Sequence, residues 1–256
     1  MTESQRYTAA EILAVLSARQ LEDGQVVFAG VGIPLLAATL AQRSRCPGLT
    51  ILFEGGVIGA FVEPGKLPPS TNDQRCTKRA NMVLGSADVL LLLQRGYVDI
   101  GFMGGAQIDQ YGNLNSSFIG DPAAPKTRLP GTGGGNDISS LTNMIVAMKH
   151  EKRRFVEKVD FITSPGFIRG HKTRAESGLS TGGMFRVVTE LAVFGFDEQT
   201  RRMKVLALNP GVSREEVQDN TGFELIFDEG VTMTEPPTSH ELDTLRTLDP
   251  ERLFTA

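Results

Sequence analysis

The stretch "QVVFAGVGIPLLAATLAQRS", residues 25–44, decides the fold class. A short apolar run rich in valine is followed by two glycines and then by apolar residues at helical spacing, with Pro34 near the start of that spacing. Proline is favoured in a first helical turn because the N–H that it lacks would have no partner there. The stretch therefore predicts a strand, a tight turn and a helix, which is the unit from which parallel sheets are built.

The same alternation continues on both sides of this unit. Thr8 and Glu11 have the spacing of a capping box, so a helix is predicted over residues 8–21. Further helices are predicted in "ADVLLLLQRG" (87–96) and "SREEVQDNTG" (213–222), and strands in "LTILFEGG" (49–56), "VDIGFMGG" (98–105), "DFITSPG" (160–166), "FRVVTELAVFGF" (185–196) and "KVLALNPG" (204–211). We predict an α/β fold, with an open, mostly parallel or mixed sheet flanked by helices, as a single domain over residues 1–256.

Composition excludes several classes of protein. With 256 residues, 40% of them hydrophobic and 22% charged, the chain is typical of a globular protein with a sizeable core. A net charge of −4 argues against a nucleic-acid partner. The first residues lack the pattern of a secretory leader, which predicts a cytoplasmic protein, and the apolar runs are far shorter than the roughly 20 residues of a membrane span.

No metal site is predicted. The two cysteines, Cys46 and Cys76, and the three histidines, His150, His171 and His240, show no metal-ligand spacing. Two long stretches, residues 61–75 and 118–137, are rich in Pro, Gly and short polar residues and are predicted as loops. Loops of this length inside a compact domain are usually functional or mobile.

Glu54 is the most informative charged residue. It follows the apolar run of "LTILFEGG" and precedes two glycines. Burying an unpaired carboxylate costs several kcal/mol in roughly any apolar setting, so Glu54 either lies at an exposed strand end or serves chemistry. In open α/β sheets ligands bind at the carboxyl ends of strands, which is where this residue is predicted to lie.

The loop "GTGGGND" (131–137) is the second candidate for chemistry. Successive backbone N–H groups at Gly133, Gly134 and Gly135 can converge on an anion or a developing oxyanion. A flexible linker is the alternative interpretation. A phosphate-binding Walker loop is excluded because no Gly-Lys-Ser/Thr follows.

Three further stretches keep two interpretations each. "AGVGIPL" lacks the third glycine of a dinucleotide fingerprint and fits a tight turn. In "MGGAQIDQYGNLNSS" (103–117), Gly104 and Gly105 end a predicted strand, and Tyr111-Gly112-Asn113 either lines a pocket or forms a hairpin turn. "KHEKRRF" (149–155) is a solvated or partner-facing patch or attracts a nucleotide phosphate, and its His150 has no matched nucleophile for a catalytic triad.

The chain resembles the β subunit of class I CoA-transferases, especially the glutaconate CoA-transferase type. The resemblance covers nearly the whole chain, and it is carried by "GVGIP", "FEGG", "FMGGAQIDQYGNLNSSFIGD", "KTRLPGTGGGNDIS", "HEKRRFVEKVDFITSPGF" and "NPGVSREEVQDNTGFEL". In that family a glutamate at a strand end is the covalent nucleophile, and Glu54 matches it. Gly55 stands where many members carry Ser or Asn.

The resemblance implies a ping-pong transfer of CoA between an acyl-CoA and a carboxylic acid through a glutamyl-CoA thioester at Glu54. Gly55 and Gly56 are expected to leave room for that bulky intermediate, and they are substrate-binding candidates together with Gly104 and Gly105. The N–H groups of residues 133–135 are expected to stabilise the oxyanions. Coenzyme A is then a co-substrate, with no permanently bound cofactor.

The resemblance also implies a partner, a homologous α subunit in a heterodimer or an α2β2 assembly. The alternative enzyme is an acyl-CoA hydrolase, decarboxylase or ring-cleaving enzyme on the same fold, with Glu54 as general base. Relatives of that kind have lost the glutamate, so its presence favours the transferase. A non-catalytic subunit is the third hypothesis. Residues 61–80 do not closely resemble the glutaconate type, and the acid substrate stays open.

Overall fold

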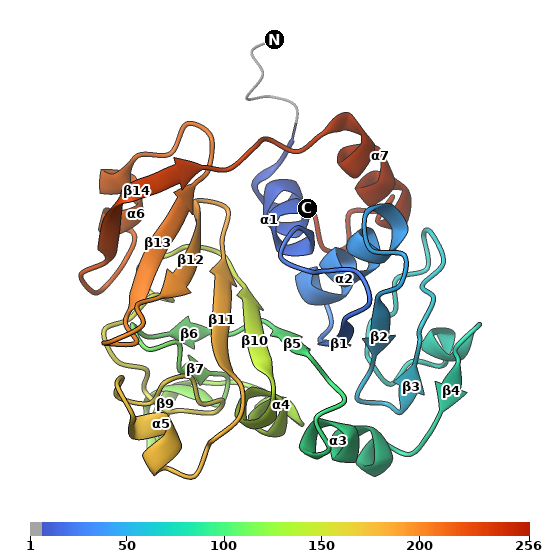
Figure 1. The fold of residues 1–256 in the computed structure, drawn as a ribbon, viewed down its shortest axis with the longest axis horizontal. Helices are drawn as coiled ribbons and strands as arrows, with labels where there is room; N and C mark the ends of the chain where they lie inside the picture. The colour runs from blue at the N-terminus through green and yellow to red at the C-terminus, as the bar shows by residue number, and fades with distance from the viewer. Residues whose placement is uncertain (1–6) are drawn as a thin grey trace. The chain divides into compact units, whose positions relative to one another are not determined.

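The structure, a computed structural model, describes residues 7–256. The chain forms two compact units, which are described one at a time (Figure 1). Unit 1 consists of Met1–Gly104 and Pro236–Ala256, and unit 2 consists of Gly105–Glu235. The single domain predicted over residues 1–256 stays a prediction.

Unit 1 is built around five strands in the order β5-β1-β2-β3-β4. β1 is parallel to both β2 and β5, whereas β3 and β4 are antiparallel additions. Its elements are α1 (Ala9–Ala18), β1 (Val26–Ala29), α2 (Ile33–Ser44), β2 (Thr50–Leu52), β3 (Val57–Ile58), a 3-10 helix (Gln74–Thr77), β4 (Met82–Val83), α3 (Ser86–Gln94), β5 (Ile100–Met103) and α7 (Ser239–Leu248).

The unit β1-turn-α2 that the sequence predicts is confirmed. Gly32, with φ of +90°, directly precedes α2, and Pro34 lies in the first turn of that helix. The positive φ explains this glycine, because side chains with a Cβ rarely adopt that conformation. Leu35 and Leu36 are fully buried, and α2 contacts β1, α1 and α7. The three helices α1, α2 and α7 pack together in unit 1 (Figure 1).

Helix α1 has the predicted capping box and a second anchor. The Glu11 N–H donates to Thr8 Oγ1 at 3.1 Å, and the Thr8 N–H donates to Glu11 Oε2 at 2.8 Å. The buried Glu11 carboxylate also pairs with Arg246 of α7, with Nε to Oε1 at 2.7 Å. A buried carboxylate needs such partners, so one residue both starts α1 and ties it to α7.

Unit 2 contains five strands in the order β14-β13-β12-β11-β10. β10 is parallel to β11 and β13 to β14, and the pairs between β11, β12 and β13 are antiparallel. Its elements are β6 (Gln107–Ile108), β7 (Leu114–Asn115), β8 (Phe118–Asp121), β9 (Ala124–Arg128), α4 (Gly135–Leu141), β10 (Asn143–Ala147), α5 (Thr173–Glu176), β11 (Gly183–Val188), β12 (Ala192–Phe196), β13 (Met203–Leu208), α6 (Arg214–Asp219) and β14 (Ile226–Met233).

Three sequence predictions in unit 2 are wrong. Residues 160–166 form no strand, because the segment makes only a single bridge, Ser164 to Leu114, before Pro165 removes the next donor. Residues 185–196 form two strands, β11 and β12, joined by a turn in which Thr189 Oγ1 accepts from the Ala192 N–H at 3.0 Å. The predicted loop 118–137 contains the hairpin β8–β9.

The predicted class, an α/β fold with a mixed sheet flanked by helices, is confirmed. Within residues 7–256, no helix has the length and apolar character needed to cross a membrane. The same residues contain no group of three or more His, Cys, Asp or Glu side chains that could hold a metal ion.

Candidate active site

The sheet of unit 1 has a topological switch point at the end of β1. Phe28 pairs with Leu52 of β2 on one side and with Gly101 of β5 on the other, and all three strands are parallel. The chain therefore leaves these strands at one edge of the sheet. Such an edge is where open α/β folds bind ligands.

Glu54 lies at this edge, as predicted. The Gly56 N–H donates to the Phe53 carbonyl at 3.0 Å, so Glu54 and Gly55 are the central residues of a β-turn that joins β2 to β3. Phe53 is fully buried and Glu54 is partly buried. The turn thus presents a carboxylate from a rigid support at the switch point.

Gly55 and Gly56 are closely packed by neighbouring segments, and their expected role in leaving room for an intermediate stays a prediction. A Cβ at Gly55 would lie 2.6 Å from the Thr71 carbonyl oxygen and 2.7 Å from Asn72 Oδ1. A Cβ at Gly56, whose φ is +101°, would overlap the Leu84 carbonyl oxygen. The two glycines therefore allow neighbouring segments to pack closely on the turn, and this closeness holds its shape.

Sequence reasoning missed the residues that enclose this turn. Thr71 and Asn72 belong to the stretch 61–75, which the sequence marks as a functional or mobile loop without saying what it contacts. The Leu84 N–H donates to the Gly56 carbonyl at 2.9 Å, which places the end of β4 against the turn. The only sequence signal was the length and Pro-rich character of the stretch, because its contacts are long-range.

Gly104 and Gly105 lie where the sequence places them, directly after β5. Gly104 is exposed and ends unit 1, at the same edge of its sheet as Glu54. Gly105 begins unit 2, where a Cβ would lie 3.0 Å from the Leu114 side chain. Their role in substrate binding stays a prediction.

The glycine loop of unit 2 is a shaped turn that leads into α4. Gly131 and Gly133 have positive φ values of +87° and +54°, which favour glycine, whereas Gly134 has φ of −72°, which any residue can adopt. The Gly135 N–H donates to the Thr132 carbonyl at 2.9 Å, so this N–H helps to close the turn. The flexible-linker interpretation does not fit this geometry.

Side chains hold the loop against the segment 163–164. Asn136 Nδ2 donates to the Thr163 carbonyl at 3.1 Å, and the Thr132 and Ser164 hydroxyl groups are 3.5 Å apart. That segment continues into Gly166, whose N–H donates to Asn113 Oδ1 at 2.9 Å. The support of the loop is therefore polar, in contrast to the backbone enclosure around Glu54.

Asp109 anchors this polar network. Its Oδ1 accepts the Tyr111 N–H at 2.9 Å and the Asn113 N–H at 3.1 Å, and its Oδ2 accepts Asn113 Nδ2 at 2.9 Å. Only 4% of Asp109 is exposed. Burial raises the pKa of Asp109 to about 6, although the hydrogen bonds from Asn113 and Tyr111 oppose that rise.

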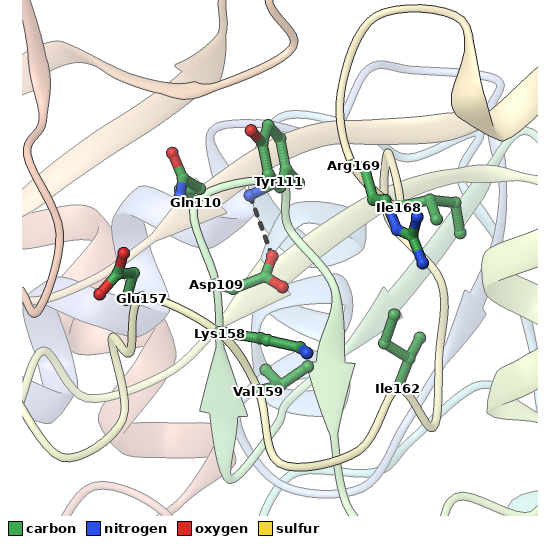
Figure 2. A pocket seen from close by; sticks show the side chains of 9 residues that line it. All are labelled: Asp109, Gln110, Tyr111, Glu157, Lys158, Val159, Ile162, Ile168 and Arg169. Carbon is green, nitrogen blue, oxygen red and sulfur yellow. Dashed lines mark hydrogen bonds between the residues drawn. The ribbon is translucent and has the colours of Figure 1, made fainter.

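Both interpretations of Tyr111-Gly112-Asn113 hold. Residues 109–113 form the turn of the β6–β7 hairpin, in which Ile108 pairs with Leu114. Tyr111 also lines a pocket of about 640 Å³ (Figure 2). The other residues lining this pocket are Asp109, Gln110, Glu157, Lys158, Val159, Ile162, Ile168 and Arg169. None of the candidates for transferase chemistry lines it.

His150 takes no part in a triad, as the sequence indicates. Its ring stacks on Phe155 at 4.1 Å between centroids, and its two nitrogens contact the hydroxyl groups of Thr189 and Thr221 at 3.2 and 3.0 Å. Burial lowers the pKa of His150 to about 4, so the ring is neutral near pH 7. His150 is a structural residue beneath the cationic surface of "KHEKRRF".

Comparisons with known proteins agree with this geometry. Residues 10–220 match the family Coenzyme A transferase. The chain is 38% identical to the B subunit of 3-oxoadipate CoA-transferase from Pseudomonas knackmussii, over 95% of this chain and 94% of that protein. It is 40% identical to the B subunit of glutaconate CoA-transferase from Acidaminococcus fermentans, over 92% of this chain and 90% of that protein.

The crystal structure of the Acidaminococcus glutaconate coenzyme A-transferase superposes with a TM-score of 0.91 at 37% identity, covering 98% of both chains. A cholesterol ring-cleaving hydrolase IpdB subunit of Mycobacterium tuberculosis is 34% identical over 96% of both chains. The match of the family to most of the chain, together with relatives of this similarity, decides the assignment. The chain belongs to the coenzyme A transferase family, as a B subunit of the glutaconate and 3-oxoadipate CoA-transferase type.

Proposed function

We propose that Glu54 is the covalent nucleophile of this CoA-transferase subunit and carries CoA between an acyl-CoA and a carboxylic acid. The observation that carries the proposal is a carboxylate on an enclosed glycine turn at the switch point of the sheet. A carboxylate is a weak nucleophile in water, and a rigid support lowers the cost of holding it against a thioester. Coenzyme A is a co-substrate in this proposal.

The reaction proceeds in two halves. One Glu54 oxygen attacks the thioester carbonyl, and the CoA thiolate leaves, which forms an acyl-glutamyl anhydride. The thiolate then attacks the glutamyl carbonyl and releases the first acid as its carboxylate, leaving a glutamyl-CoA thioester. In the second half, the acceptor carboxylate attacks this thioester, and the thiolate returns to the acceptor acyl group and restores Glu54.

Each attack creates an oxyanion that needs a donor. We propose that backbone N–H groups of the glycine loop, residues 133–135, supply it. The positive φ of Gly133 supports this role, because it shapes the loop in a way that other residues resist. The Gly135 N–H also donates to Thr132, so an oxyanion would share this donor with the turn. A well-placed donor is worth roughly 3 kcal/mol in the transition state.

Relatives that are named as B subunits imply an A subunit, and the surface of unit 1 suggests where it binds. Met82 and Val83 of β4 are 56% and 58% exposed, and Leu91 of α3 is 43% exposed. Exposed large apolar side chains on an edge strand and on a nearby segment of the chain favour a protein partner. We propose that the A subunit covers them, in an α2β2 assembly. A cytoplasmic location is also part of the proposal.

Peptide mass spectrometry, after incubation of the complex with substrate, tests whether Glu54 is the nucleophile. When the complex receives acyl-CoA without an acceptor acid, we expect the peptide that contains Glu54 to gain the mass of CoA less one water. Glu54→Gln should show no adduct and no transfer. The matched control is Glu63→Gln, which removes a carboxylate that pairs with Lys78 in unit 1 and should keep both.

The hydrolase with Glu54 as general base is the second candidate, because the ring-cleaving hydrolase subunit is a relative at 34% identity. In that case acyl-CoA is consumed without an adduct on Glu54, and oxygen from labelled water enters the product acid. Transfer of labelled CoA to a second acid, with the adduct, supports the transferase. A Glu54→Ala complex with full activity contradicts both enzymes.

A further inference from the structure

A cationic groove lies on unit 2, apart from the residues assigned above. It has a volume of about 310 Å³ and is lined by Ala106, Ile119, Lys126, Thr127, Arg153 and Arg154. Half of its lining residues are cations, in a chain whose net charge is −4. Such a local excess of positive charge marks a site for an anion.

The backbone on both sides of the groove is well anchored. Lys126 lies on β9, whose neighbour Thr127 pairs with Ile119 of β8. On the other side, the Arg154 carbonyl accepts the Ile108 N–H at 2.7 Å, and the next residue, Phe155, is fully buried. The three cations therefore project from fixed backbone. Less conformational entropy of the protein is then lost when an anion binds.

The groove has more positively charged side chains than carboxylates that pair with them. Glu151 Oε2 accepts from Nε of Arg153 at 2.7 Å and from Nε of Arg154 at 3.0 Å. These two bonds use one edge of each guanidinium, whereas an arginine has five N–H donors. Within residues 7–256 no ion pair of Lys126 is found. Arg153 and Arg154 thus share one carboxylate, and Lys126 adds a third positive charge to the groove.

The groove is connected to the glycine loop through the chain itself. After β9, the Leu129 N–H donates to the Ser117 carbonyl at 3.0 Å and the Gly131 N–H to the Ser116 carbonyl at 2.8 Å. The hairpin thus continues as an ordered path from Lys126 to the loop. The chain between Lys126 and Gly134 spans at most about 28 Å.

We propose that this groove binds the phosphate groups of coenzyme A, with the pantetheine arm running toward the glycine loop. The inference rests on the proposed function, because it takes CoA as the co-substrate. Arginine donors match phosphate oxygens in pairs, and Lys126 adds a compact positive charge. Ile119 and Ala106 supply a small apolar wall. Of the stretch "KHEKRRF", Arg153 and Arg154 then act in substrate binding.

Titration calorimetry of the complex with three probes tests the groove. The probes are CoA, dephospho-CoA and pantetheine, which carry successively fewer phosphates. The variant Lys126→Ala/Arg153→Ala removes two cations of the groove, and we expect it to bind CoA at least about tenfold more weakly. The variant should weaken the binding of dephospho-CoA by a smaller factor. It should bind pantetheine with the same affinity as the unchanged complex. The affinity for CoA should also depend less steeply on salt concentration.

Two single variants sharpen the test. Lys152→Ala is the matched control, because Lys152 lies in the same basic stretch but lines a different pocket, and it should leave CoA affinity unchanged. Glu151→Gln should strengthen CoA binding severalfold, since it removes the carboxylate that competes for both arginines.

The outcomes separate this inference from the proposed function. Equal CoA binding by the double variant and the unchanged complex overturns the groove assignment while the transferase proposal stands. If the double variant loses affinity for CoA and for pantetheine by the same factor, the groove assignment is also overturned, because the effect then does not depend on the phosphates. If the unchanged complex binds neither CoA nor pantetheine, the proposed function itself fails.

Discussion

Gly56 in unit 1 and Gly131 in unit 2 have similar positive φ values in different surroundings. Their φ values are +101° and +87°. A Cβ at Gly56 would overlap the Leu84 carbonyl oxygen, whereas a Cβ at Gly131 would meet nothing within 4 Å. The turn that carries Glu54 is shaped by backbone packed against backbone, and the glycine loop is shaped by its own conformation and by side-chain hydrogen bonds.

The difference indicates how each region responds to change. The groups that contact Gly55 and Gly56 are carbonyl oxygens, an N–H group and the Asn72 side chain, none of which titrates. The loop is supported through Asn136 and Thr163 by a network that contains Asp109, whose pKa is raised to about 6. The turn that carries the proposed nucleophile is thus held by packing, and the proposed oxyanion donors are supported by a polar network that contains a titrating carboxyl group.

The largest effect is expected at Gly56. Gly56→Ala must move the Leu84 carbonyl or the turn and must also accept a positive φ, so we expect a loss of at least about 4 kcal/mol in the free energy of unfolding. Transferase activity should be lost with it. Urea unfolding followed by circular dichroism measures the change. If the free energy of unfolding of Gly56→Ala stays within about 1 kcal/mol of the original, as for an ordinary surface substitution, then the Leu84 carbonyl does not enclose this glycine tightly.

The second effect is expected at Gly133. Gly133→Val places a β-branched residue at a φ of +54°, which turns the neighbouring N–H groups. We expect kcat to fall by on the order of 10², as for a lost oxyanion donor, with the KM for acyl-CoA little changed. Steady-state kinetics on the complex measure both. An unchanged kcat with a native circular dichroism spectrum means that the loop is only a connector.

The third effect concerns Asp109 and pH. Its pKa is raised to about 6 in the folded chain from 3.8, so the folded state holds the proton more tightly between these values. The stability that Asp109 contributes is full below pH 3.8 and is lost as the pH rises through about 6. When the pH is lowered from 7 to 4, the free energy of unfolding of the original chain should therefore rise by on the order of 2 kcal/mol relative to that of Asp109→Asn.

Urea midpoints of both chains at several pH values measure this difference. The lowered pKa of His150, about 4, acts in the opposite direction in the same range, but it is common to both chains and cancels in the comparison. A pH-independent difference contradicts the assignment of the raised pKa to Asp109.

The smallest effect is expected at Gly131, the counterpart of Gly56. Gly131→Ala meets no neighbouring atom, so only the backbone conformation resists it, at about 1 kcal/mol. Activity should stay within a factor of about two, since about 1 kcal/mol of stability leaves the folded population almost unchanged. If Gly131→Ala is as damaging as Gly56→Ala, then conformation and not enclosure explains both glycines.

Local patterns predicted the parts of the fold that depend on neighbouring residues. The capping box of α1, the turn before α2 and the strand before Glu54 all follow from residues a few positions apart. The predicted strand at 185–196 failed because its turn uses the Thr189 hydroxyl and contains no glycine or proline. Turns closed by a side chain give a weak signal in sequence.

The environment of the site depends on distant contacts and was not predictable in the same way. Nothing near Gly55 in the sequence shows that Thr71 and Asn72 lie against it. Equally, four glycines in "GTGGGND" look equivalent as letters, and only their φ values separate Gly131 and Gly133 from Gly134. The resemblance to CoA-transferases made Glu54 the candidate nucleophile, and the packing explains why glycines follow it.

The discontinuity of unit 1 has a consequence for the order in which the chain becomes functional during synthesis. Helix α7 belongs with α1 and α2, and the pair Glu11–Arg246 joins residues 235 positions apart. Arg246 leaves the ribosome only after all of unit 2, so unit 2 can fold while α1 still waits for its partner. The unit that bears Glu54 is therefore completed only after all of unit 2 has been made.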